Sequence, residues 1–106
     1  MFINYDDLEM LEFFENNPIN VGEDGGGLLI YSLEDSTSFA MTLIMDVYAK
    51  LISINILYKR NIVFSGEFDG IVEIKKSDTV LIIDLEDRRR LVLKKYPCLG
   101  LIIEKT

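Results

Sequence analysis

From residue 28 onward the chain runs in short segments with apolar residues at every second position, and this feature restricts its fold most. Met41, Leu43 and Met45 share one side of such a segment, and Thr42 lies on the other. Because successive side chains of a β-strand point to opposite faces, the period predicts strands with one buried face. Turn-forming residues separate the segments at 34–37, 48–50, 59–61, 69–70 and 76–78. This spacing predicts an antiparallel meander.

Residues 38–52 fit two patterns. Ala40, Leu43, Ile44 and Val47 also match one face of a helix, with Ser38 as a cap. We interpret the segment as strand, because the flanking segments are rich in β-branched residues. A helix is the alternative.

The N-terminal segment has the features of a helix between residues 4 and 16. Asp6 or Asn4 can cap it, acids fill its first turn, and Pro18 follows its end. We expect an apolar stripe of Leu8, Leu11 and Phe14, with Met10 or Phe13 beside them, to pack on the sheet.

The sequence thus predicts an α+β fold, in which an N-terminal helix packs on a mainly antiparallel β-sheet. The sheet is expected to form a meander, a half-barrel or a sandwich. One domain of 106 residues is the simplest arrangement, since a chain of this length divided into two domains would make each of them marginally stable. It comprises a helical segment at 1–18, a Gly-rich loop at 19–27 and a β-rich core at 28–106.

The composition excludes most catalytic templates. The chain has no histidine and a single cysteine, Cys98, so Ser-His-Asp and Cys-His arrangements cannot be built. The Gly-rich loop lacks a Gly-Lys-Ser/Thr ending, and Glu23 and Asp24 would repel a phosphate. No acidic cluster has the spacing of a calcium loop. We therefore expect no catalytic residues, no metal site and no cofactor, with Cys98 packed in the core.

The charges are distributed unevenly along the chain. The net charge is −7, yet residues 1–49 contain ten acids and no Lys or Arg, while the remainder carries +3. An acidic half-molecule repels nucleic acid and anionic membranes, and it attracts basic proteins. The expected partner is therefore a basic protein, without direct binding to nucleic acid or to a membrane.

The candidate partner-binding residues are acids in the expected helix, loop and turns. They are Asp7, Glu9, Glu12, Glu15, Glu23, Asp24, Glu34 and Asp35, followed by Glu67 and Asp69.

The basic cluster at 88–90, with Lys94 and Lys95, is interpreted as a turn with charged strand ends. The alternative is that its cations balance Glu86 and Asp87 or form an ion-pair site for a partner. Among the tyrosines, alternation places Tyr31 and Tyr58 in the core. Their positions next to turns predict that Tyr48 and Tyr96 are exposed, where they could contribute to a protein interface.

The start of the chain lacks the basic and apolar regions of a secretory signal, and no apolar run approaches the ~20 residues of a spanning helix. These features predict a cytoplasmic protein.

The segments at 39–48, 52–58, 63–68 and 80–85 resemble those of small immunity proteins from bacterial polymorphic toxin systems. The similar class is the immunity proteins of contact-dependent growth inhibition. The resemblance implies a non-enzymatic cytosolic protein that binds and neutralises a cognate toxin domain, often a nuclease. A structural or adaptor domain that self-associates or joins a larger complex is the alternative.

Overall fold

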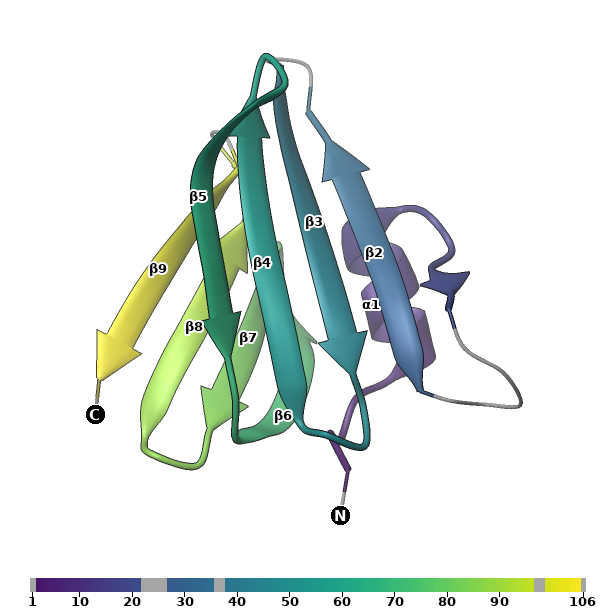
Figure 1. The fold of residues 1–106 in the computed structure, drawn as a ribbon, viewed down its shortest axis with the longest axis vertical. Helices are drawn as coiled ribbons and strands as arrows, with labels where there is room; N and C mark the ends of the chain where they lie inside the picture. Colours follow the sequence, from purple (N-terminus) through teal and green to yellow (C-terminus); the bar gives the residue numbers. More distant parts are fainter. Residues whose placement is uncertain (1, 22–26, 36–37, 97–98, 106) are drawn as a thin grey trace.

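The computed structural model describes residues 2–21, 27–35, 38–96 and 99–105, and its fold is drawn in Figure 1. The elements in chain order are α1 (Asp7–Phe14), β1 (Ile19–Asn20), β2 (Leu28–Glu34), β3 (Phe39–Asp46), β4 (Leu51–Tyr58), β5 (Asn61–Phe68), β6 (Ile71–Ser77), β7 (Val80–Leu85), β8 (Arg89–Lys94) and β9 (Gly100–Lys105).

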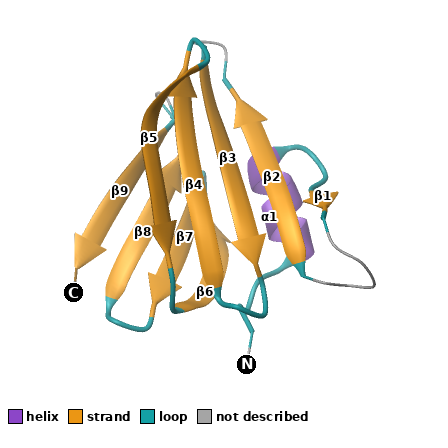
Figure 2. Cartoon of the chain, in the orientation of Figure 1, coloured by secondary structure: helices purple, strands orange, loops and turns teal. Residues whose placement is uncertain are grey.

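The strands form two antiparallel sheets that face each other. β1 to β5 make one sheet and β6 to β9 make the other, and in both sheets the spatial order of the strands is the chain order. Figure 2 shows the five-stranded sheet in front of the four-stranded one. The chain passes from one sheet to the other at Asp69 and Gly70, where the positive φ of 69° suits a glycine. The α+β class and the antiparallel sheet are as predicted.

The core lies between the two sheets and consists of the inward-facing alternate residues. Met41, Leu43 and Met45 on β3 and Ile52 and Ile54 on β4 are all fully buried. From the other sheet come Ile71, Ile74, Leu81, Ile83, Leu91 and Leu93. The period of two therefore identified the inner face of β3 and β4 correctly, whereas in β6 a register shift places Ile71 and Ile74 inward and leaves Val72 exposed. The structure also settles residues 38–52, which form β3, a turn and the start of β4 rather than a helix.

Helix α1 closes one side of the sandwich, behind β2 in Figure 1. Asp6 caps it, because its Oδ1 accepts hydrogen bonds from the backbone N–H groups of Leu8 (2.8 Å) and Glu9 (3.2 Å). Before the cap, the Ile3 N–H donates a hydrogen bond of 3.0 Å to the carbonyl of Val47, the residue that follows β3 of the front, five-stranded sheet. Asn4 forms a parallel bridge with Glu73 of the rear sheet. The start of the chain therefore bonds to both sheets.

The buried stripe of α1 agrees with the predicted one at Phe14 and its neighbours but not at the two leucines. Met10, Phe13 and Phe14 are fully buried, and the Phe14 ring stacks on Tyr31 at 5.0 Å. Leu8 is 63% exposed and Leu11 is 39% exposed. Apolar residues surround most of this two-turn helix, so its pattern allowed two stripes, and the two phenylalanines bury more apolar area than the two leucines.

Three segment boundaries also differ. The helix covers 7–14 rather than 4–16, and it ends at Glu15 in the left-handed conformation. The expected loop at 19–27 contains β1, which pairs with Leu29 and Ile30 of β2. Residues 22–26 of that loop, and Cys98 with its predicted core position, lie outside the described residues.

Within the described ranges, no helix has the length and hydrophobicity needed to cross a lipid bilayer.

Candidate functional site

The acids of α1 divide between solvent and contacts with β6. Asp7 is exposed in the first turn. Glu9 Oε1 accepts a hydrogen bond of 2.9 Å from the backbone N–H of Lys76, and Glu12 Oε1 lies 4.0 Å from Lys76 Nζ. Glu9 and Glu12 therefore help to hold the helix on the rear sheet, while Asp7 faces water.

Three predicted acids lie together where α1 and β2 end. Glu15, Glu34 and Asp35 line one hollow of about 200 Å³, together with Leu33, Lys95, Tyr96 and Leu99. We call these three acids the acidic corner. Lys95 Nζ lies 3.2 Å from Glu15 Oε2 and donates to the Phe13 carbonyl at 2.7 Å, so it offsets part of the corner's charge.

Asp35 also has a structural role in the corner. Its Oδ1 accepts a hydrogen bond of 3.0 Å from the Phe39 N–H, and its Oδ2 accepts one of 3.4 Å from the Leu99 N–H. Asp35 thus links the start of β3 to the segment before β9. Glu34, by contrast, is exposed at the end of β2.

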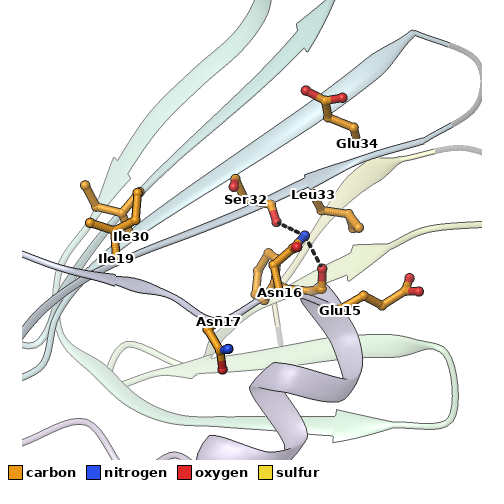
Figure 3. Close-up of a pocket in the computed structure, with 9 residues that line it drawn as sticks. Glu15, Asn16, Asn17, Ile19, Ile30, Ser32, Leu33 and Glu34 are labelled. Carbon is orange, nitrogen blue, oxygen red and sulfur yellow. Dashed lines mark hydrogen bonds between the residues drawn. The ribbon is translucent and has the colours of Figure 1, made fainter.

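A larger groove of about 520 Å³ adjoins the corner between the end of α1 and β2. Figure 3 shows Glu15 and Glu34 at one end of it, with Leu33 between them in this view. Asn16 Nδ2 donates to the carbonyls of Phe14 (3.2 Å) and Ser32 (3.5 Å). β1 pairs with Leu29 and Ile30 in the first part of β2. The edge of β2 beyond these residues therefore borders the groove.

A third hollow, of about 350 Å³, lies on the other side of Glu34. It is bounded by Glu34 and Asp35, by Leu57 of β4 and by Lys59 and Arg60 of the β4–β5 turn. Glu34 therefore borders three hollows. Among their described lining residues, the cations are Lys59 and Arg60 in this third hollow and Lys95 in the smallest one.

The remaining candidate acids are elsewhere. Glu67 and Asp69 are exposed at the far end of the front sheet from Glu34, because β5 runs antiparallel to β4 and ends where β2 begins. Glu23 and Asp24 lie outside the described residues. The fold thus gathers three of the ten candidate acids into one corner.

The basic turn at 88–90 has mostly internal partners. Arg89 Nε bonds to Asp87 Oδ2 at 2.7 Å, and Arg90 Nε bonds to Asp84 Oδ1 at 2.8 Å. The backbone N–H of Arg89, followed by its guanidinium, holds the pKa of Asp87 below its usual value. Glu86 pairs with Lys50 rather than with the arginines. The balance of charge given as the alternative is confirmed for Asp87.

The candidate residues were selected by charge, so the uncharged residues that line these hollows were missed. Leu33 and Leu99 line the corner and are buried, and Ile30 and Ser32 line the larger groove. The alternation along β2 was the available signal, since it separates Ile30 and Ser32 from the inward-facing Tyr31 and Leu33. Tyr48 and Tyr96, predicted to be exposed, are 63% and 66% exposed. In the described part of the chain, no three potential metal ligands of the His, Cys, Asp or Glu type are grouped.

Comparison by sequence gives no relative, since neither a protein-family model nor a curated protein sequence matches this chain. Comparison by structure gives a match. A chain of the contact-dependent growth inhibition toxin–immunity protein complex from Klebsiella pneumoniae 342 superposes with a TM-score of 0.82 and 16% sequence identity. The match covers 98% of each chain. The two chains share one fold. The resemblance seen in the sequence and this structural neighbour point to the same class of system.

Proposed function

We propose that this chain is an immunity protein of a contact-dependent growth inhibition system, and that it neutralises a cognate toxin domain by binding it in the cytoplasm. The observation that carries the proposal is the match over 98% of the chain to a component of a toxin–immunity protein complex. The shared fold makes a related role the simplest expectation, although function resides in the binding surface rather than in the fold.

The composition favours the immunity role over the toxin role. A toxin domain that acts chemically needs nucleophiles, general bases or metal ligands, whereas an inhibitor needs only a complementary surface. This chain has no histidine and one cysteine, and its net charge is −7. A non-catalytic inhibitor is consistent with this composition.

The proposed partner is a basic toxin domain, such as a nuclease. Nuclease clefts carry cations that bind the phosphate backbone, and an acidic protein can occupy such a cleft in place of nucleic acid. Among the proposed contact residues, Glu34 is exposed and borders all three hollows, so the acidic corner ranks first. The others are Asp7, Glu9, Glu12, Glu23 and Asp24, with Glu67 and Asp69 second.

The alternative role, self-association, is supported by the strands at two sheet edges. Ile62 and Val63 on β5 and Ile102 and Ile103 on β9 are all exposed. Apolar residues on an open edge favour pairing with another strand. Under this alternative the protein is a structural domain without a toxin partner.

Growth rescue and co-purification test the proposal together. The tagged chain is purified from its host in low and in high salt, and the domain recovered with it, as the candidate toxin domain, is expressed in cells with and without this chain. We expect the toxin domain alone to arrest growth, co-expression to restore it, and a 1:1 complex to be recovered. Continued arrest in the presence of the soluble chain, or recovery of a homo-oligomer alone, would reject the immunity role.

A further inference from the structure

The outward faces of the two sheets carry different charges. On the rear sheet, Glu73, Asp84 and Glu104 are balanced by Lys75, Arg90 and Lys94 on the same face. Arg90 pairs with Asp84 at 2.8 Å, and Lys75 Nζ lies 3.9 Å from Glu73 Oε1. This balanced face is typical of a sheet surface in contact with water.

The outward face of β2 to β5 has no such balance. We call it the front face, since it faces the viewer in Figure 1. The strand register arranges its residues in three rows across the four strands. The rows are Glu34–Ala40–Leu57–Ile62, Ser32–Thr42–Asn55–Ser65 and Ile30–Ile44–Ser53–Glu67, followed by Leu28, Asp46 and Leu51 at the lower end.

Charge on the front face is confined to its border. Glu34, Asp46 and Glu67 lie at its periphery, and none of the outward positions in these rows is Lys or Arg. The middle consists of aliphatic, hydroxyl and amide side chains, of which Ile44, Leu57 and Asn55 are half-buried. Protein interfaces have this distribution, with few charges at the centre and a polar rim.

We propose that the front face is the surface on which the toxin domain docks. This inference rests on the proposed function and specifies the surface that performs it. The partner that fits is a globular domain with a neutral, partly apolar patch whose border includes Lys and Arg, because the three charges within the rows are all negative. Lys59 and Arg60 of the β4–β5 turn stand beside the Glu34 end of the face, where an acidic group of the partner fits. Glu34 belongs both to this face and to the acidic corner, so the two acidic regions form one continuous surface.

The dimensions of the front face suit one protein partner. Four strands about 4.8 Å apart and eight residues rising about 3.3 Å each span roughly 19 by 26 Å. The flat area of about 490 Å² is the larger part of the roughly 800 Å² that a specific interface buries on each partner, and the adjoining acidic corner extends it.

The central row supplies groups for hydrogen bonds. Ser65 Oγ donates to Asn55 Oδ1 at 2.8 Å, which orients the amide of Asn55 so that its N–H groups remain for a partner. Thr42 occupies the neighbouring position on β3. With roughly one hydrogen bond per 100–200 Å² of interface, this row can contribute several. On the rear face the corresponding row is Lys75, Ile82, Val92 and Ile102, which lacks hydroxyl and amide groups.

A matched pair of substitutions tests the docking surface. Ile44→Lys introduces a cation at the middle of the front face, and Ile82→Lys makes the identical change at the middle of the rear face. Both residues are half-buried and lie on strands with neighbours on both sides. The affinity of each purified variant for the purified toxin domain is measured by calorimetry, after circular dichroism and thermal unfolding have shown that each variant is folded.

We expect Ile44→Lys to weaken binding by roughly 30-fold or more, as for a residue central to an interface, and Ile82→Lys to change it by less than about 3-fold. Thr42→Arg, which adds a cation at a half-buried polar position, is the second front-face variant, and it should weaken binding even if Ile44→Lys fails to fold.

Each other outcome rejects the proposal in a distinguishable way. Equal affinities for wild type and both front-face variants would overturn the docking surface and leave the immunity role intact. A homodimer that Ile44→Lys dissociates, with toxin binding unchanged, would assign the face to a second copy and overturn the proposal. Absence of toxin binding by the wild-type chain would reject the immunity role, and the docking surface with it.

Discussion

Tyr31 is buried in the middle of β2, and its environment determines its acidity. Only 1% of its surface is exposed, and the ring stacks on Phe14. Burial, followed by the nearby Tyr5 and Asp7, raises the pKa of its hydroxyl from 10.0 to about 12. The neutral phenol is therefore the form that the folded state favours.

Stability should fall as the pH rises from about 10 to about 12, because in this window the unfolded chain has lost the Tyr31 proton and the folded chain retains it. The full contribution is present below pH 10 and is lost as the pH passes the folded pKa. The expected loss is roughly 2 kcal/mol. Urea unfolding at several pH values measures it, with Tyr31→Phe as the control that keeps the stacked ring. A variant that lost stability as steeply as the wild type would contradict this assignment.

The sequence placed both Tyr31 and Tyr58 in the core, and the two residues show what alternation determines. Tyr31 is buried, but Tyr58 is 37% exposed. Tyr58 ends β4, where its ring contacts Phe39 at 4.7 Å and lies beneath Lys59 Nζ at 5.4 Å. Alternation predicts the face to which a side chain points, whereas its burial also depends on its distance from the end of the sheet.

At the scale of elements, the docking of α1 depends on aromatic residues rather than on its leucines. Phe14→Ala should lower the free energy of unfolding by about 3–5 kcal/mol, because it removes a fully buried ring from the contact with Tyr31. Leu8→Ala on the same helix should change it by less than about 0.5 kcal/mol, since Leu8 is mostly exposed. Urea unfolding of both variants compares a buried residue of α1 with an exposed one. Equal losses would restore the stripe predicted from the sequence.

The β4–β5 hairpin has an unfavourable turn sequence. Lys59 and Arg60 both have positive φ, at 51° and 69°, as in a two-residue type I′ turn. Asn-Gly is preferred at these positions, because other residues lose roughly 1–2 kcal/mol in the left-handed conformation. Lys59→Asn with Arg60→Gly should therefore raise the thermal unfolding midpoint by several degrees.

The matched control for this prediction is Lys59→Ala with Arg60→Ala. It removes the same charges and retains two side chains at positive φ. If the alanine variant were stabilised as much as the Asn-Gly variant, relief of charge repulsion rather than of backbone strain would be the cause.

For the molecule as a whole, the sequence predicted a meander with a sandwich among its possible forms, but not where the meander divides into two sheets. Consecutive strands pair throughout, except between β5 and β6. There the Ile71 N–H bonds to the Lys50 carbonyl and the Glu86 N–H bonds to the Gly70 carbonyl, so the turn at 69–70 joins two ladders instead of closing a hairpin. Turn residues predict that a strand ends, whereas the next partner is decided by which faces can cover one another.

The charge distribution was also predictable only in part. The first half of the chain contains acids and no Lys or Arg, but the fold brings cations of the second half to several of these acids. Lys76 contacts Glu9 and Glu12, and Lys95 contacts Glu15. The excess of negative charge is therefore concentrated on fewer positions than the sequence indicated, with Glu34 an exposed member of the acidic corner.

This arrangement leads to a prediction about association kinetics. If the acidic corner and the front face attract a basic toxin domain, the association rate constant should fall by at least about tenfold as the salt concentration rises from about 20 to 500 mM. The dissociation rate constant should change much less, because it depends on the contacts at the neutral centre of the interface. Stopped-flow mixing with the purified toxin domain measures both.

Two variants separate a local field from net charge. Glu34→Lys and Glu104→Lys change the net charge equally, but Glu34 borders the front face and Glu104 lies on the rear sheet. Glu34→Lys should slow association and reduce its salt dependence more than Glu104→Lys does, most clearly at about 100 mM salt, where the Debye length of about 10 Å limits the field of Glu104 to its own side of the molecule. Equal slowing by the two substitutions would mean that steering comes from the overall charge of −7 and not from the corner.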